Sequence, residues 1–212
     1  MSLAKKFKNN RGFTLVELMI VVVIIGILAA LAIYGVRQYV NNAKTGEARQ
    51  ALGRMSKDAA AAFEAERMSG ALLPLGTTVG TTRRLCASAT AAVPATMKAA
   101  GEKYQPQPSD WIGSDPTVGW QCLKFTMDQP ILFQYNYRAS QDAANPTPDS
   151  SGFTASAQAD MGGVYKLMHI SGLVRAQNNT TVLTVSPSIV ESDETSAVAN
   201  PEFWTSSTPS SS

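Results

Sequence analysis

The sequence has little of what enzymes use for catalysis. It contains one histidine, His169, and two cysteines, Cys86 and Cys122. There is no glycine-rich loop suited to phosphate and no cysteine–histidine spacing suited to zinc. His169 lies in the apolar run of residues 167–170, where a strand histidine is far more often structural than catalytic. We therefore expect no enzymatic activity, no resident metal and no cofactor.

Charge is also absent from a long stretch near the N-terminus. From Leu18 to Val36 there are 19 residues without an ionisable acid or base. At a rise of about 1.5 Å per residue, such a helix is about 29 Å long, close to the thickness of a bilayer's hydrocarbon core. We expect residues 13–36 to cross a membrane. Glu17 lies at the edge of this segment, and an ionisable group at mid-membrane costs about 2.5–3.5 kcal/mol, so Glu17 is a candidate functional residue.

The first twelve residues lack acids but carry four bases, which are Lys5, Lys6, Lys8 and Arg11. This is typical of a leader that stays on the cytoplasmic side of a membrane. An ordinary signal peptide has a shorter apolar core followed by a small-residue cleavage site. Here the plausible cut precedes the apolar run, so the helix would remain on the mature chain. A cut after Gly12 would create an ammonium on Phe13, about one helical turn from Glu17.

The string RGFTLVELMIVVVIIGILAALAI, residues 11–33, resembles the class III signal of type IV prepilins, the N-methylphenylalanine family. The resemblance covers residues 5 to about 68. It implies that a membrane-embedded prepilin peptidase cuts after Gly12 and methylates the amino group of Phe13. It also implies that Glu17 neutralises the amino terminus of a neighbouring subunit during assembly. An ordinary single-pass anchor with an accidental glutamate is the alternative.

The chain departs from that family at one position. Many type IV pilins have a proline where this chain has Tyr34, and proline would kink the helix. Here Tyr34 is followed by Gly35, which weakens a helix by about 1 kcal/mol relative to alanine without forcing a bend. The family's proline-directed bend is therefore not implied for this chain.

The helix is expected to continue beyond the membrane as an amphipathic segment over residues 37–69. Apolar residues recur there at steps of three and four, which gives one stripe at helical period: Ala48, Leu52, Met55, Ala59, Ala62 and Phe63. Gly70 follows as a stop signal. One helix should therefore run from about Phe13 to Ser69, with its second half packed on a sheet.

The remainder is expected to form a connector and then an antiparallel sheet. Residues 70–117 are rich in proline and glycine and form the connector, with a possible short helix over Ala87–Ala100 interrupted at Pro94. Strand patterns occupy four or five stretches within residues 118–185. These stretches are Val118–Met127 and Ile131–Arg138, separated by a turn at residues 128–130; Phe153–Ala159 and Val164–Val174, separated by a turn at residues 160–163; and the edge segment Thr181–Val185. Residues 186–212, rich in serine and threonine, are expected to be a mobile tail.

These elements predict an α+β fold in which a long N-terminal α-helix, membrane-spanning in its first half, packs on an antiparallel β-sheet of about four strands. This agrees with the type IV pilin fold that the resemblance implies. The predicted segments are a removed leader, two helix halves, a connector, a sheet and a tail; their bounds are 1–12, 13–36, 37–69, 70–117, 118–185 and 186–212.

The cysteines and the charge distribution limit the remaining possibilities. Cys86 and Cys122 both follow the membrane segment, so a disulfide is expected if that side lies outside the cytoplasm; two unpaired buried thiols are the alternative. After residue 12 there are 14 basic and 16 acidic residues, which does not favour nucleic-acid binding by bulk charge. The pair Arg83-Arg84 leaves such binding uncertain. The acids at 191, 193 and 194 suit either calcium or, more ordinarily, a solvated turn.

We interpret the chain as the precursor of a type IV pilin, most simply the major structural subunit. The expected partners are copies of itself in a helical filament, the prepilin peptidase, the pilus assembly machinery and, before assembly, the bacterial inner membrane. The assembled pilus would be extracellular and would serve motility, adhesion or DNA uptake. A minor pilin, a type II secretion pseudopilin and a membrane-anchored receptor that does not assemble are the alternatives.

Overall fold

The computed structural model describes residues 12–65, 83–113, 115–140, 151–178 and 180–194. The chain divides into two compact units, Met1–Ala43 and Lys44–Ser212. Helix α1 (Leu15–Glu64), which has 50 residues, contributes its first part to one unit and its second part to the other. The predicted helix over Phe13–Ser69 is confirmed between Leu15 and Glu64, and residues 66–69 lie outside the described residues.

In the first unit the helix is apolar and uncovered. Its large apolar side chains are 42–82% exposed, counting Phe13 just before the helix. The α-helix runs through Tyr34 and Gly35 without interruption. This part is long and apolar enough to cross a membrane by length and composition. Because so much apolar surface is unfavourable in water, it requires a membrane or other apolar helices around it.

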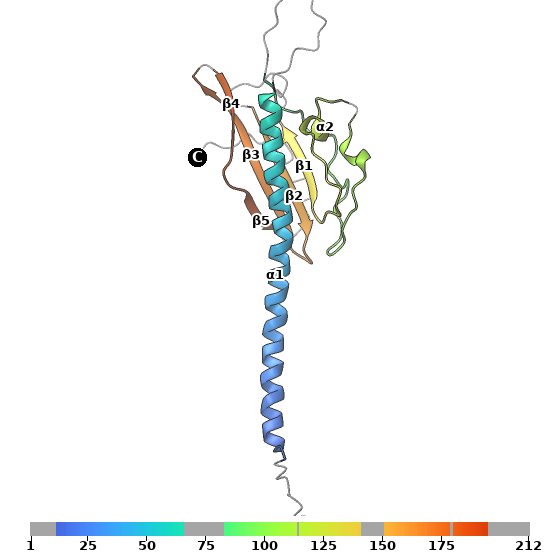
Figure 1. Cartoon of the computed structure of the whole chain (residues 1–212), viewed down its shortest axis with the longest axis vertical. Helices are drawn as coiled ribbons and strands as arrows, with labels where there is room; N and C mark the ends of the chain where they lie inside the picture. Colours follow the sequence, from blue (N-terminus) through green and yellow to red (C-terminus); the bar gives the residue numbers. More distant parts are fainter. Residues whose placement is uncertain (1–11, 66–82, 114, 141–150, 179, 195–212) are drawn as a thin grey trace, which may run out of the picture. The chain divides into compact units, whose positions relative to one another are not determined.

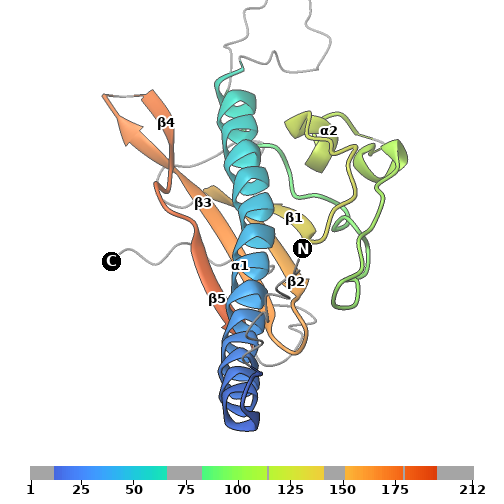
Figure 2. The ribbon, with the colours of Figure 1, turned by 60° about the horizontal axis from the view of Figure 1, so that its bottom comes forward.

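In the second unit the apolar stripe of α1 is buried, as predicted. Each of its six members is at most 8% exposed: Ala48, Leu52, Met55, Ala59, Ala62 and Phe63. Here α1 crosses one face of the sheet (Figures 1 and 2). The stripe joins one hydrophobic cluster with residues of the strands and their flanks, among them Phe133 just before the first strand and Tyr135 and Tyr137 within it. The helix stripe at period 3.6 and the apolar side chains at every second position, Phe133, Tyr135 and Tyr137, thus create the core together.

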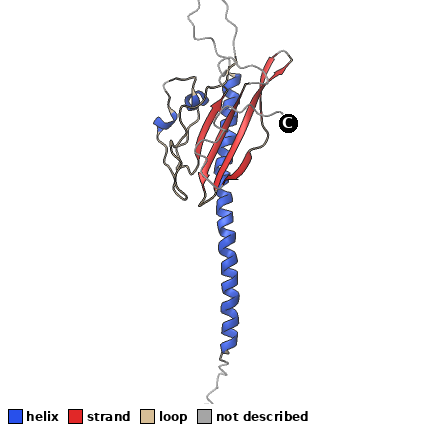
Figure 3. Ribbon diagram, turned by 180° about the vertical axis from the view of Figure 1, so that it is seen from behind, coloured by secondary structure: helices blue, strands red, loops and turns tan. Residues whose placement is uncertain are grey.

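The sheet is antiparallel and has five strands, coloured red in Figure 3. In chain order these are β1 (Gln134–Ala139), β2 (Gly152–Asp160), β3 (Tyr165–Gln177), β4 (Thr180–Val185) and β5 (Val190–Glu194). The spatial order is β1-β2-β3-β4, and β5 also pairs with β3. The 13-residue strand β3 is long enough to pair with both along one edge, with β5 at residues 165–169 and with β4 at residues 172–177.

The β2–β3 hairpin forms where the sequence predicts it. Its turn has positive φ at Gly162 and Gly163, and Asp160 Oδ1 accepts hydrogen bonds from both of their N–H groups. Gly172 of β3 lies opposite Phe153 of β2 in the same hairpin. A Cβ atom at Gly172 would lie 2.3 Å from Cε1 of Phe153, so the aromatic ring occupies the place of the missing side chain.

The predicted strand over Val118–Met127 is wrong. Residues Gly119–Leu123 form a short helix, α2, after Val118, and the sheet begins only at Gln134. Gly119 adopts φ 52°, and a Cβ atom there would lie 2.7 Å from the Cα of Ala89. This close backbone approach explains the glycine and replaces the expected hairpin.

The mobile tail predicted from residue 186 is wrong in its first part. Residues Val190–Glu194 form β5, so the acidic residues lie in a strand rather than in a solvated turn. Glu191 of β5 forms an ion pair with Arg49 of α1, and Asp193 forms one with Lys166 of β3. These cations offset the poor strand propensity of the acids. Residues 195–212 lie outside the described residues.

The described part of the connector covers the free edge of β1. No helix forms over residues 87–100; the backbone there is irregular and exchanges hydrogen bonds with the strand. Val93 and Tyr135 each donate an N–H to the other's C=O, at 2.9 and 2.8 Å. Tyr104 and Ile131 do the same at 2.8 Å, just before β1. The connector also contains a 3-10 turn, Pro108–Trp111.

Candidate functional site

The first candidate site lies where α1 begins. Gly12 and Phe13 precede the helix in exposed, non-helical backbone, and a Cβ atom at Gly12 would have no neighbour within 4 Å. Phe13 is 82% exposed. The peptide bond between these two residues is therefore open to an approaching enzyme, as cleavage would require.

Glu17 and Thr14 form a reciprocal cap at this helix start. The N–H of Thr14 donates to Glu17 Oε2 at 3.0 Å, and the Thr14 hydroxyl donates to the same oxygen at 2.8 Å. In return, the N–H of Glu17 donates to the Thr14 hydroxyl oxygen at 3.3 Å. This is a capping box, which satisfies backbone donors that a helix start otherwise leaves unpaired. Our sequence reasoning missed Thr14, although the Thr-x-x-Glu spacing was a readable signal.

The cap uses only one carboxylate oxygen of Glu17. Within the described residues, Oε1 has no hydrogen-bond partner. The side chains that follow, from Leu18 onward, are apolar and exposed. The helix start thus presents one fixed carboxylate, with one oxygen free to accept a hydrogen bond from an external cation. Its position in the first turn is also favoured by the helix dipole.

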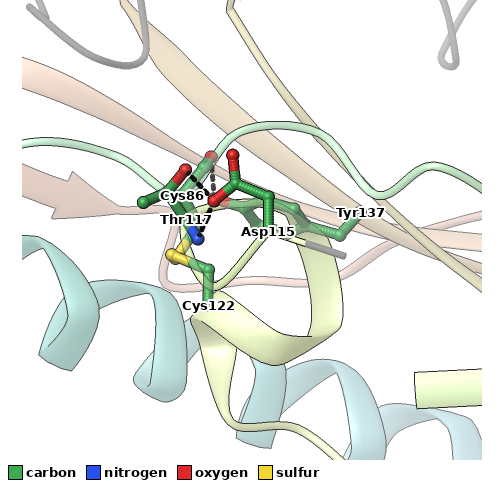
Figure 4. Close-up of a disulfide and its surroundings, with 5 residues drawn as sticks. All are labelled: Cys86, Asp115, Thr117, Cys122 and Tyr137. Atoms are coloured by element: carbon green, nitrogen blue, oxygen red, sulfur yellow. Dashed lines mark hydrogen bonds between the residues drawn. A yellow bond between two sulfur atoms is a disulfide. The ribbon is translucent and has the colours of Figure 1, made fainter. Parts of the chain in front are cut away.

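The second candidate feature is the disulfide between Cys86 and Cys122, which the structure contains (Figure 4). The Cα atoms are 5.6 Å apart, and the two residues are 1% and 4% exposed. The bridge joins the connector to α2, at the position where the sequence predicted the strand Val118–Met127. It therefore fastens the segment that covers β1.

Hydrogen bonds hold the surroundings of the disulfide in place (Figure 4). The hydroxyl of Tyr137 on β1 donates to the C=O of Cys86 at 3.4 Å, and burial raises the pKa of this tyrosine far above its ordinary value. The hydroxyl and N–H of Thr117 both donate to Asp115 Oδ1 at 2.7 Å and so hold the pKa of that carboxyl below its ordinary value. These groups are structural, because each is engaged locally.

Two buried tryptophans meet at the disulfide-bonded helix α2, which contains Trp120 and contacts Trp111 through it. The rings of Trp111 and Trp120 lie edge to face with centroids 5.2 Å apart, and Phe125 packs against both. The guanidinium of Arg54 on α1 lies 4.5 Å above the Phe125 ring. This cluster links the connector, α2 and the helix stripe, so its fluorescence reports on the packing of all three.

The other polar residues singled out from the sequence are not assembled into a reactive site. His169 lies on β3, half buried, and burial lowers its pKa. Arg83 is held by Glu64 at 3.3 Å and by the C=O of Thr181 at 3.0 Å, which leaves it poorly placed to contact DNA. Within the described residues, no three metal-binding side chains gather into a group. Two of the three acids of β5 instead form ion pairs, Glu191 with Arg49 and Asp193 with Lys166.

One hollow of about 520 Å³ lies between the second part of α1 and residues 125–130. Three of its charged groups are in ion pairs, since Glu47 pairs with Lys103 at 3.7 Å and Arg54 pairs at 3.7 Å with Asp58, which lies outside the hollow. Arg54 also donates to the C=O of Thr126 at 2.7 Å. The hollow offers no poised acid, base or nucleophile.

Comparison with known proteins points to the same N-terminal segment. A family model described as the prokaryotic N-terminal methylation motif matches residues 7–33. The type IV major pilin protein PilA of Myxococcus xanthus (strain DK1622) is 58% identical over 41 residues, which is 19% of this chain and 19% of that protein. The chain thus matches about a fifth of the length of this relative. No solved structure matches the chain.

Proposed function

We propose that this chain, which belongs to the type IV pilin family, is the precursor of a major pilin that assembles into an extracellular filament. The geometry of Glu17 is the observation that carries the proposal. A capped carboxylate with one open oxygen stands at the start of a helix whose apolar side chains are uncovered. Such a helix suits two surroundings in turn, the bilayer before assembly and the other copies of itself afterwards.

Processing supplies the cation that Glu17 lacks. Cleavage by a prepilin peptidase after Gly12 converts the amide nitrogen of Phe13 into an amino group, which the enzyme then methylates. An unpaired charge in apolar surroundings is strongly unfavourable, so the carboxylate penalises any subunit that docks without a cation beside it. A neighbouring subunit's Phe13 amino group meets that requirement at one position only. Glu17 thereby sets the register, while apolar burial at about 25 cal/mol per Å² supplies the cohesion.

The mode of association follows from using two different surfaces. The amino terminus of one subunit contacts Glu17 of another, which is a heterologous contact. Repeated contacts of this kind do not close on themselves and therefore generate a helical fibre. The inner membrane stores the subunits, and the assembly machinery transfers them to the base of the filament.

Two substitutions separate the charge of Glu17 from its capping role. Glu17→Gln keeps an oxygen that can accept from Thr14, because glutamine also serves at this position of a capping box, but it removes the charge. Glu17→Val removes both. We expect both variants to insert in the membrane normally and both to lose surface filaments, measured by immunoblotting of sheared fibres and of membrane fractions. Normal filament yield with Glu17→Gln would show that the cap alone matters and that the charge has no role in assembly.

The abundance of this chain in sheared filaments distinguishes a major from a minor pilin. A major pilin would be the dominant band, and its deletion would remove the fibre. A non-assembling receptor would keep residues 1–12 and would be absent from the sheared fraction. Calcium-dependent folding would favour a pseudopilin instead.

A further inference from the structure

The edges of the sheet differ in how well they are protected against pairing with a strand of another chain. The outer edge of β1 is covered by the connector, which exchanges backbone hydrogen bonds with Tyr135. On the opposite side, β5 has the sequence VESDE and carries three acids, at 191, 193 and 194. Charged side chains on an edge discourage pairing with another strand. Of the three outer strands, β1 is thus protected by the connector and β5 by its charges.

Strand β4 carries no charge of its own, and within the described residues its outer edge is covered at one position, where Arg83 donates to the C=O of Thr181. Its sequence, TTVLTV, contains no charge and no proline and is composed largely of β-branched residues. It forms the end of the strand order, beside β3, and is labelled β4 at the rim of the sheet in Figures 1 and 2. An uncharged, β-branched edge is the kind that another strand extends.

The hydrogen-bond alternation shows which groups of β4 point outward. Ser186, just after the strand, donates its N–H to Ser171 of β3 at 2.8 Å, so even-numbered positions face β3. The C=O of Thr181 is instead reached from outside by Arg83. In an antiparallel ladder these orientations alternate, so the backbone groups of Leu183 and Val185 face away from β3. Within the described residues those outward groups have no hydrogen-bond partner.

We propose that β4 pairs with β4 of a second copy of this chain, antiparallel and centred on Leu183. In this register the outward groups of Leu183 meet those of its own equivalent, and Thr181 meets Val185. On the outer face, Val182 lies opposite Thr184 of the other copy. The Leu183 pair exchanges two backbone hydrogen bonds, whereas the C=O of Thr181 already accepts from Arg83 and has one lone pair left for Val185 of the other copy.

A second copy is favoured over other partners by its lack of opposing charge and by the many identical β4 edges that a filament presents. Two β4 strands are self-complementary, because neither strand carries a charge of its own and the nearby Arg83 is already paired with Glu64, whereas two β5 strands would oppose acid to acid. The proposed filament presents many identical edges at once, and such multivalency turns a weak single contact into a stable one. The β4 contact is two-fold and therefore closes, so it cannot extend one helical fibre. It joins neighbouring fibres side by side, a consequence that rests on the proposed function.

A charged substitution on the exposed face of β4 tests this pairing. Thr184 is exposed, and in the proposed register two Thr184→Lys side chains lie diagonally across the two strands, about 7–8 Å apart. Gln121→Lys, an exposed position on α2, makes the same change of charge away from the sheet edge. Leu183→Pro removes the central outward donor and leaves the bonds to β3 intact, which tests the hydrogen bonds without adding charge.

Sheared filaments of the full chain are counted as single fibres or bundles by electron microscopy, and total fibre is measured by immunoblotting. We expect bundles from the wild type and Gln121→Lys, and loss of bundles at unchanged fibre yield from Thr184→Lys and Leu183→Pro. Three results would overturn the β4 contact: bundles that persist in Thr184→Lys, a wild type that forms no bundles, or an equal loss of bundles in Gln121→Lys. Failure of the wild type to form any fibre would overturn the proposed function instead.

Discussion

Opening the disulfide should destabilise the second unit by a large and calculable amount. Cys86 and Cys122 are 36 residues apart, and both are buried. In the chain-entropy treatment, a closed loop of this size restricts the unfolded chain by about 13 cal/mol/K, or about 4 kcal/mol at 25 °C. Since domains are commonly stable by only about 5–15 kcal/mol, this loss is a major fraction of the total.

The assay is urea unfolding of the full chain in detergent micelles, which keep the apolar half of α1 covered. Fluorescence of Trp111 and Trp120 reports the transition, because Trp120 is part of α2 and Trp111 packs against it. With a slope of about 2 kcal/mol/M, a loss of about 4 kcal/mol lowers the midpoint by about 2 M urea. The double variant Cys86→Ala/Cys122→Ala should unfold at the same lowered midpoint with or without reductant.

A small effect would refute this reasoning. If reduction moved the midpoint by less than about 0.5 M, which is about 1 kcal/mol at that slope, the bridge would not be constraining the unfolded chain as supposed. If reductant also shifted the double variant, the effect would arise elsewhere than in this disulfide.

Three further predictions concern other positions. Gly172→Ala should destabilise the sheet by about 1–3 kcal/mol in the same assay, because the new methyl overlaps the Phe153 ring; an unchanged midpoint would contradict the tight contact. Arg49 holds the pKa of Glu191 below its ordinary value of 4.5, so their ion pair should stabilise the fold above that value and cease to do so as pH falls through the lowered pKa. Because Arg49 is half exposed, wild type should exceed Glu191→Gln by less than about 1 kcal/mol at pH 7 and match it at pH 2; equal stability at both would refute the role. Gly12→Val should block removal of residues 1–12, seen by intact mass, by crowding the bond to be cut; a variant that is still shortened would exclude that explanation.

The sequence predicted the elements whose signals are periodic and local. The stripe on α1 follows steps of three and four, and its members are buried because only one face of the helix meets the sheet. The β2–β3 hairpin is marked by two consecutive glycines that adopt positive φ at its turn. At the candidate site, Glu17 was identified because a charge beside a long apolar run is conspicuous. Cleavage after Gly12 and methylation of Phe13 stay predictions.

What could not be predicted depends on contacts distant in sequence. Residues 118–127 are rich in apolar residues, and such a run is ambiguous between strand and helix. The outcome is decided by the disulfide to Cys86 and by the close packing of Gly119 on Ala89. Strand β5 could not be recognised from the sequence because its acids disfavour a strand. The cations that pair with two of them lie on α1 and β3.

The contact between Arg49 and Glu191 has a consequence for the timing of folding. The two residues are 142 positions apart in the chain. At a synthesis rate of about 5–20 residues per second, about 7–30 seconds separate their appearance. Helix formation takes about a microsecond, so the second half of α1 is ready long before the strands that cover it. A nascent chain therefore displays the apolar stripe until the segments that cover it have been made, and cellular factors that shield exposed apolar helices have their opportunity before the sheet is complete.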